Sequence, residues 1–148
     1  MPADVGAMLA LIKELATYEK ASGEVSATEA TMLADGFGEN AIYKALVAEA
    51  DNQVVGTAIY YFAYSTWKGR MLYLDDFIVT ESFRGYGIGK KLFDALGELA
   101  KAENANVFRW HVLNWNAPAI NFYKKYDASM DGSWLTCKFT KEQIETLF

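Results

Sequence analysis

The sequence predicts an α+β fold in which a mixed, mostly antiparallel central sheet carries helices on both faces. Three observations lead to this prediction. Apolar residues recur at helical spacing near the N-terminus, three β-prone segments follow one another between residues 43 and 79, and strand and helix patterns alternate after that. The 148 residues suit one domain, spanning 1–148, with a single sizeable core.

Two helices are expected before the first strand. Apolar residues recur every three or four positions from Val5 to Leu15, which is the spacing of one helix face. The stretch from Ser26 to Glu29 matches a capping box and predicts a second helix that ends near Asp35.

The three β-prone segments predict a meander. They cover Tyr43–Ala50, Val54–Tyr64 and Arg70–Val79, and they are rich in β-branched and aromatic residues. The pair Asp51-Asn52 and the stretch 65–69 provide the turns. Gly56 predicts a bulge within the second strand.

The rest of the chain alternates between helix and strand patterns. The expected elements are a helix from Ile88 to about Asn104, a strand over Val107–Leu113, a short helix capped by Asn116, a strand over Trp134–Phe139 and a terminal helix capped by Thr140 and Gln143. Together with the meander, this order places helices on both faces of the sheet.

Composition and charge exclude several classes of protein. The net charge of −5 disfavours a nucleic-acid partner, and no apolar run reaches the roughly 18 residues of a membrane helix. The N-terminus lacks the basic and apolar regions of a signal peptide, and Cys137 is the only cysteine, so we expect a cytoplasmic protein. No cluster of histidine, cysteine and acidic residues has the spacing of metal ligands, so no metal is expected.

The glycine-rich stretch RGYGIG, residues 84–89, lies between a predicted strand and a predicted helix. By themselves, these six residues also fit a flexible turn. Their context favours a phosphate site, because unpaired N–H groups gather at a helix start and glycines let an anion approach the backbone closely. Arg84, Lys90 and Lys91 add positive charge. The lysine-threonine ending of a P-loop and the downstream acid of a dinucleotide-binding fold are missing.

The pattern Arg84-x-x-Gly87-x-Gly89 resembles the pyrophosphate-binding motif of the GNAT acetyltransferases. The stretches LIKELATYEK, DGFGENAIYKALVAE, AIYYFAYSTWKGRMLYLDDFIVTESFRGYGIGKKL and WNAPAINFYKKYDAS resemble the spermidine/spermine N-acetyltransferase group, which includes thialysine and diamine acetyltransferases. This resemblance covers nearly the whole chain. It implies the GNAT fold, a homodimer, and acetyl transfer from acetyl-CoA to a primary amine of a small polyamine, diamine or thialysine-like substrate by direct attack in a ternary complex.

The resemblance also implies where acetyl-CoA binds. It places the cofactor along the end of the third strand, on the glycine-rich stretch and beside the short helix. The residues concerned are Phe77, Ile78, Val79, Arg84, Gly85, Tyr86, Gly87, Ile88, Gly89, Lys90, Asn116 and Ala119.

Acetyl transfer to an amine needs a base and an acid, because the amine is protonated at neutral pH and the departing thiolate takes up a proton. Strand alternation predicts that Asp75 and Asp76 face opposite sides, so that only one faces the reacting centre. The resemblance favours Asp75 as the base and leaves Asp76 a structural charge. Helical spacing alone leaves Phe122, Tyr123 and Tyr126 open, and the resemblance selects Tyr123 as the acid.

The expected amine site combines acidic and aromatic residues. Tyr18, Glu19 and Asp75 align with residues that hold or activate the amine in the family. Trp110 and His111 are further candidates for lining the substrate pocket. A purely structural role is the alternative for His111, the only histidine.

The chain departs from the family pattern in its first strand and in the number of its carboxylates. Met1-Pro2-Ala3 stands where the family has completed its first strand, so this strand is expected to be missing or truncated and one sheet edge to be bare. Ser65 replaces an acid, and the acidic stretch before the last strand is reduced to MDGSW. Fewer carboxylates favour a short diamine or a thialysine-like amine. A protein N-terminus as acceptor, and a CoA-binding module without turnover, are the alternatives.

Overall fold

The computed structural model describes residues 1–148, which form two compact units, Met1–His111 and Val112–Phe148. The first unit contains the sheet, and the second contains the last two helices and the segment between them. Each unit is described by itself. The single domain expected from the chain length stays a prediction.

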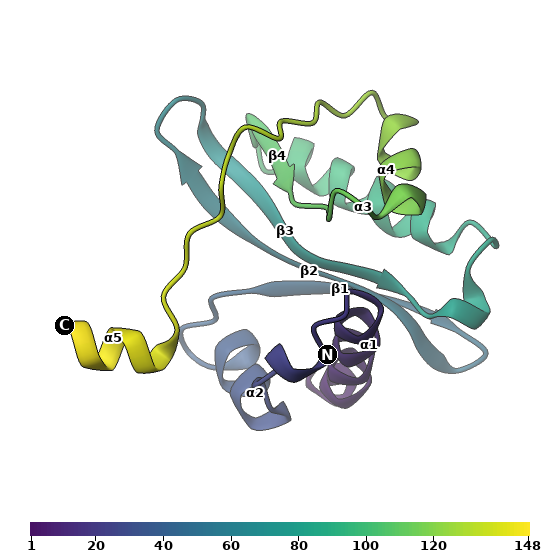
Figure 1. Ribbon diagram of the computed structural model, residues 1–148. Coiled ribbons are helices and arrows are strands. Elements are labelled where there is room, and N and C mark those ends of the chain that lie inside the picture. The colour runs from purple at the N-terminus through teal and green to yellow at the C-terminus, as the bar shows by residue number, and fades with distance from the viewer. The chain divides into compact units, whose positions relative to one another are not determined.

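A four-stranded sheet lies at the centre of the first unit (Figure 1). Its strands, in spatial order, are β1 (Lys44–Ala50), β2 (Gln53–Ser65), β3 (Gly69–Val79) and β4 (Val107–Trp110). The pairs β1–β2 and β2–β3 are antiparallel, and the pair β3–β4 is parallel. The predicted mixed, mostly antiparallel sheet is therefore confirmed. The β1–β2 turn has both Asp51 and Asn52 at positive φ, as a tight hairpin requires.

Helices cover both faces of this sheet, as predicted (Figure 1). On one face, α1 (Val5–Tyr18) and α2 (Glu29–Phe37) share a core in which Met8 and Met32 pack with Ile59 of β2. On the other face lies α3 (Ile88–Ala102), whose Phe93 packs on Phe77. Short 3₁₀ turns are η1 (Pro2–Asp4), η2 (Ser22–Glu24) and η3 (Glu81–Phe83). None of the helices combines the length and the hydrophobicity needed to cross a membrane.

The predicted start of α2 was wrong by two residues. The N-cap is Thr28 instead of Ser26, because the Thr28 hydroxyl accepts a hydrogen bond of 3.2 Å from the N–H of Thr31, which completes the capping box.

Two irregularities interrupt the register of β2. Ala48 pairs with Gly56 and Glu49 with Val54, so the bulge predicted at Gly56 lies at its neighbour, residue 55. Further along, Ile59 pairs with Asp76 whereas Tyr60 pairs with Leu74, so that Asp75 is an extra residue without an opposite partner. Side chains do not alternate regularly across such a bulge. The prediction that Asp75 and Asp76 face opposite sides therefore loses its basis.

The second unit contains α4 (Ala117–Lys124) and α5 (Lys141–Leu147), and both predicted caps are confirmed. Asn116 accepts from the N–H of Ala119 at 3.3 Å, and Thr140 and Gln143 form the capping box of α5. The strand predicted over 134–139 was wrong, and β4 ends three residues before its predicted end at 113. A β pattern forms a strand only where a neighbouring strand provides hydrogen-bond partners. Residues 134–139 are exposed and pair with no strand.

Candidate active site

The strands β3 and β4 pair over only part of their length. The parallel ladder joins Met71–Leu74 to Val107–Trp110, where β4 ends, whereas β3 continues to Val79. Residues 75–79 therefore lie outside this ladder. An extended ligand that carries amides can add to a strand edge of this kind. Phe77, Ile78 and Val79, the residues expected along the cofactor, lie in this segment.

The glycine loop, residues 84–90, has a backbone that only glycine adopts easily. Gly85 has a φ of +86° and Gly87 a φ of +79°, and a Cβ atom at either position would meet nothing within 4 Å. Gly87 is also the N-cap of α3, so Ile88 and Gly89 begin the helix. The loop therefore brings the N–H groups and the positive end of a 15-residue helix to an open surface. This arrangement fits a phosphate or pyrophosphate group.

The cations of the loop are engaged inside the chain. Arg84 donates through Nε to the carbonyl of Val79 at 2.8 Å, and its Nη2 lies 3.5 Å from Oε1 of Glu14. The Nζ atom of Lys90 lies 2.6 Å from Oδ2 of Asp94. Tyr86 is 76% exposed. Anion binding here would therefore rest on the backbone of the loop at least as much as on its cationic side chains.

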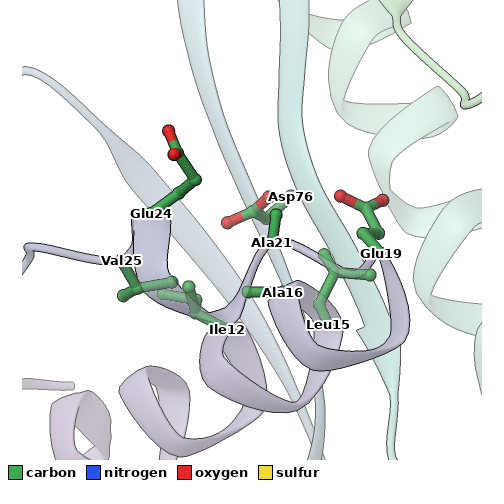
Figure 2. A pocket seen from close by; sticks show the side chains of 8 residues that line it. All are labelled: Ile12, Leu15, Ala16, Glu19, Ala21, Glu24, Val25 and Asp76. Atoms are coloured by element: carbon green, nitrogen blue, oxygen red, sulfur yellow. The ribbon is translucent and has the colours of Figure 1, made fainter. Parts of the chain in front are cut away.

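An acidic pocket of about 190 Å³ lies at the C-terminal end of α1 (Figure 2). Its three acids are Glu19 from the end of α1, Glu24 from η2 and Asp76 from β3. Its remaining walls are apolar, and they are formed by Ile12, Leu15, Ala16, Ala21 and Val25. No basic side chain lines the pocket.

The electrostatics of the acidic pocket are unfavourable for its own carboxylates. Burial, with added repulsion from Asp75 and Glu19, raises the pKa of Asp76 from 3.8 to about 6. Burial also raises the pKa of Glu19. A cation bound in the pocket would relieve this repulsion. The apolar walls and the acids together suit a ligand with a methylene chain and a positive charge.

The side chain expected to act as base lies beside a second cluster. Partial burial raises the pKa of Asp75, and the nearby His111 opposes that shift. The Nδ1 atom of His111 lies 2.6 Å from the hydroxyl of Tyr73, whose ring stacks on Tyr61 with centroids 5.1 Å apart. Asp75 therefore has a titratable imidazole within electrostatic reach, and its own charge raises the pKa of Asp76, so the two carboxylates are coupled.

The other residues expected to hold the amine lie apart from one another. Tyr18 is 39% exposed, and its ring centroid is 5.8 Å from the guanidinium carbon of Arg84. Trp110 packs edge-on against Phe93 of α3, with centroids 5.3 Å apart. The contact places Trp110 against α3, whereas the acidic pocket is bounded by α1. Its role in substrate binding stays a prediction.

Sequence reasoning missed two of the three acids of the pocket. Glu24 was not singled out because it lies in a short 3₁₀ turn, where no periodic pattern marks it. Asp76 was assigned a structural role because regular alternation was assumed across residue 75. The sequence feature that could have indicated an acidic pocket was the pair of acids at 19 and 24, which lie in the connection between two predicted helices.

Three expected site residues belong to the second unit. Asn116 and Ala119 form the N-terminal cap of α4, and Tyr123 lies in the last turn of this helix. The ring of Tyr123 packs edge-on against Phe122, with centroids 5.4 Å apart. The roles of all three in catalysis or cofactor binding stay predictions.

Comparison with known proteins agrees with this geometry. The model of the acetyltransferase (GNAT) family matches residues 9–127. A thialysine N-epsilon-acetyltransferase from Mus musculus is 41% identical over 97% of this chain and 91% of its own length. A spermidine/spermine N(1)-acetyltransferase-like protein 1 from Homo sapiens is 36% identical over 95% of this chain and 22% of its own length. Among solved structures, an integron cassette protein from V. cholerae superposes with a TM-score of 0.75 and 26% identity, covering 95% of this chain and 88% of the other.

These findings confirm the resemblance drawn from the glycine-rich motif and from the stretches around it. GNAT acetyltransferases use acetyl-CoA. The chain therefore belongs to the GNAT family of acetyltransferases and is an acetyl-transferring enzyme.

Proposed function

We propose that this enzyme acetylates a primary amine of a short diamine or of a thialysine-like amino acid. The observation that carries the proposal is the acidic pocket, which is lined by Glu19, Glu24 and Asp76 together with apolar side chains. A short chain with one or two ammonium groups matches both features. The similarity to a thialysine N-epsilon-acetyltransferase over 97% of the chain supports the same class of substrate.

The size of the pocket favours a slender substrate. At about 190 Å³ it is smaller than the roughly 300–1,000 Å³ of sites that enclose drug-sized ligands. Ser65 at the end of β2 provides no carboxylate for a longer polycation. Asp131 accepts hydrogen bonds from Ser133 and Trp134, which lower its pKa and tie it to its own turn. These features favour a diamine or a single amino acid over a long polyamine.

The cofactor proposed for the glycine loop is acetyl-CoA, which supplies an activated acetyl thioester when bound. The backbone of Gly85–Gly89 would hold the pyrophosphate, and Phe77–Val79 would offer backbone groups to the pantetheine arm. The fit rests on the two positive φ values and on the open space beside them. Asn116 and Ala119 would complete the cofactor site.

The chain's own residues then move two protons. Asp75 takes a proton from the substrate ammonium, directly or through water, because only the neutral amine is a nucleophile. Its raised pKa, caused by partial burial, makes it a better base than an ordinary aspartate. Tyr123 holds the proton that the leaving group needs. Tyr18 and Glu19 position the rest of the amine.

A panel of amines tests the proposed function. Release of free thiol from acetyl-CoA is measured with putrescine, spermidine, thialysine, lysine and a peptide with a free N-terminus. We expect the highest kcat/KM for putrescine or thialysine. Turnover only with the peptide would replace the proposal by N-terminal protein acetylation. CoA binding without thiol release from any amine would favour a module that binds CoA and does not catalyse.

We also propose that the enzyme is a cytoplasmic homodimer, which rests on the family resemblance and on the lone cysteine. Tyr60 is buried in the core and adds nothing to an exposed aromatic surface near the end of β2. Tyr64 and Trp67 are 76% and 82% exposed at the end of the β2–β3 hairpin, where a partner subunit could cover them. Sedimentation at micromolar concentration should give twice the chain mass of 16.5 kDa, and a monomer would refute the dimer.

A further inference from the structure

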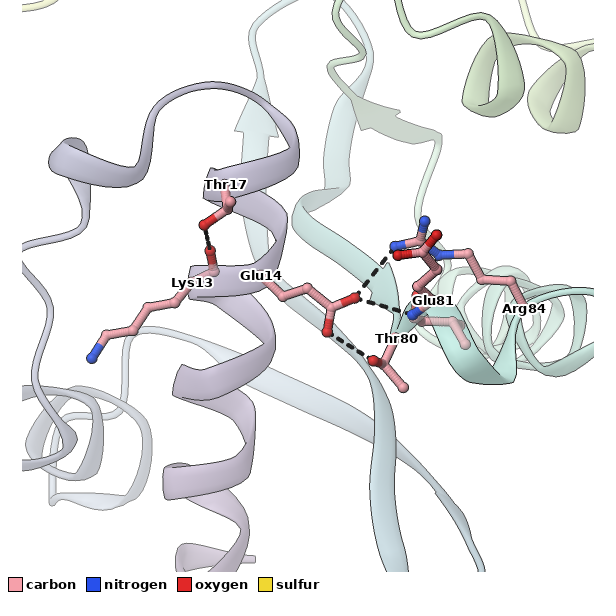
Figure 3. Close-up of polar contacts among 7 residues, drawn as sticks. Lys13, Glu14, Thr17, Thr80, Glu81 and Arg84 are labelled. Atoms are coloured by element: carbon pink, nitrogen blue, oxygen red, sulfur yellow. Dashed lines mark hydrogen bonds and ion pairs between the residues drawn. The ribbon is translucent and has the colours of Figure 1, made fainter.

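Glu14 is the centre of a polar cluster that joins α1 to the turn before the glycine loop (Figure 3). Its carboxylate accepts a hydrogen bond of 2.8 Å from the hydroxyl of Thr80 and one of 3.1 Å from the N–H of Glu81. Oε1 also lies 3.5 Å from Nη2 of Arg84. The neighbouring side chain of Lys13 points away from this cluster (Figure 3).

The two hydrogen bonds supply a cap that the turn does not provide for itself. The 3₁₀ turn η3 begins after Thr80, whose own side chain makes no capping hydrogen bond. Glu14 replaces that cap from another helix by accepting from the N–H of Glu81, the first residue of the turn. The N–H of Thr80 donates to the carbonyl of Val55 at 2.9 Å. The turn is therefore held from both α1 and β2.

Arg84 extends the cluster toward the proposed amine site. Its guanidinium donates a hydrogen bond to the carbonyl of Val79 and forms an ion pair with Glu14. It also lies over the face of the Tyr18 ring in a cation–π contact. Glu14 and Tyr18 are four residues apart, so both lie on the same face of α1. The first residue of the glycine loop is thus fixed by the end of β3 and by the helix that carries Tyr18 and Glu19.

We infer that Glu14 is a positioning residue for CoA: it fixes the turn 80–84, from which the backbone of residues 85–89 is directed at the phosphates. The inference rests on the proposed use of acetyl-CoA and adds a residue outside the glycine motif. The ion pair with Arg84 contributes little by itself, because both side chains are partly exposed, at 35% and 43%. The charge-assisted hydrogen bonds to the turn are the stronger part.

Affinity for CoA, measured by calorimetry without any amine, tests this inference. Glu14→Ala removes all three contacts and should weaken CoA binding about tenfold, the range expected for loss of a charge-assisted hydrogen bond. Glu14→Gln keeps the length of the side chain and one acceptor oxygen, so its affinity for CoA should fall less, by about threefold. The matched control is Glu98→Gln, the same charge change at an exposed position of α3, which should bind CoA as the wild type does.

A second readout separates positioning from a general loss of stability. At saturating acetyl-CoA, the Glu14 variants should keep a kcat within about twofold of the wild type, so that the defect appears in the KM for acetyl-CoA. S-Acetylpantetheine, which lacks the phosphates, should be used equally well by wild type and Glu14→Gln. A folded Glu14→Ala protein with unchanged CoA affinity, or a Glu14→Gln defect of equal size with S-acetylpantetheine, would overturn the inference. Wild-type protein that binds no CoA would instead overturn the proposed function, and the positioning role with it.

Discussion

The glycine loop and the acidic pocket differ in what holds them in place. The loop is a continuous stretch, and its conformation is set by two glycines with φ values of +86° and +79° and by the helix that starts there. The pocket is assembled from α1 and η2, which are consecutive elements, and from β3, which lies far from them in the sequence. One substitution can therefore remove the function of the loop, whereas the pocket should lose function gradually as single acids are removed.

The two regions also differ in their electrostatics. The loop presents N–H groups and a positive helix end to an anion, and its cationic side chains are already paired. The pocket holds three carboxylates, of which Glu19 and Asp76 repel each other, and no basic residue lines it. The loop is thus ready for its ligand, whereas the empty pocket is destabilised and becomes favourable when a cation enters.

The largest effect is expected from Tyr123→Phe, which should leave binding in both regions intact. Loss of a general acid lowers kcat by roughly 10²- to 10⁴-fold. The affinities for CoA and for the diamine should stay within about twofold, because in the proposed mechanism the hydroxyl acts only when the thiolate leaves. Tyr126→Phe, which removes a hydroxyl just after the same helix, is the control. A rate loss below about threefold, with chemistry shown to be rate-limiting, would exclude Tyr123 as the acid.

Gly87→Val tests the loop. A β-branched residue is strained at a φ of +79°, so the loop must change its path and its N–H groups lose their common direction. We expect the KM for acetyl-CoA to rise about a hundredfold, with diamine affinity unchanged. Gly97→Ala, in the middle of α3 and also with open space at Cβ, should behave as the wild type. A folded Gly87→Val protein with normal CoA affinity would place the phosphates elsewhere.

The loop could be predicted from sequence because its physics is local. Glycine spacing, a preceding strand and a following amphipathic helix were all visible in residues 74–96. The pocket could not, because a register irregularity at Asp75 decides where Asp76 points, and no sequence pattern marked it. Similarly, residues 134–139 have a β pattern, but only a neighbouring strand could have made them a strand. Contacts such as that of Glu14 with residue 81 depend on how α1 packs, which periodicity does not fix.

The repulsion within the pocket predicts an unusual pH dependence of stability. Asp76 has a pKa of about 6 in the folded protein and 3.8 as its reference, so the folded state binds more protons between these values. The contribution of Asp76 to the free energy of unfolding is therefore fully present below about pH 4 and is lost as the pH rises through 6. The free energy of unfolding falls by up to about 3 kcal/mol over this range. Asp76→Asn should be more stable than the wild type at pH 7.5, and the difference should vanish near pH 4.

Urea unfolding of both proteins across this range measures the difference, and the carboxylates that do not interact with Asp76 cancel in the comparison. A stability difference that does not change between pH 4 and 7.5 would contradict the raised pKa. Added putrescine should stabilise the wild type at pH 7.5 more than it stabilises Asp76→Asn, because the cation compensates the carboxylate only where it is ionised.

The smallest effect is expected from Glu19→Gln, which distinguishes the two ends of the substrate. Glu19 lies at the end of α1 with its pKa raised by burial, and we expect it to bind the ammonium that is not acetylated. Propylamine and 1,3-diaminopropane differ only in that second ammonium. Glu19→Gln should lower kcat/KM for the diamine about tenfold and leave the monoamine unchanged, since one charge-assisted hydrogen bond is lost. Glu98→Gln, with the same change of charge outside the pocket, should affect neither amine. Equal losses for the two amines would mean that Glu19 serves the structure of the α1 terminus, and a substrate without a second charge would then explain the pocket better.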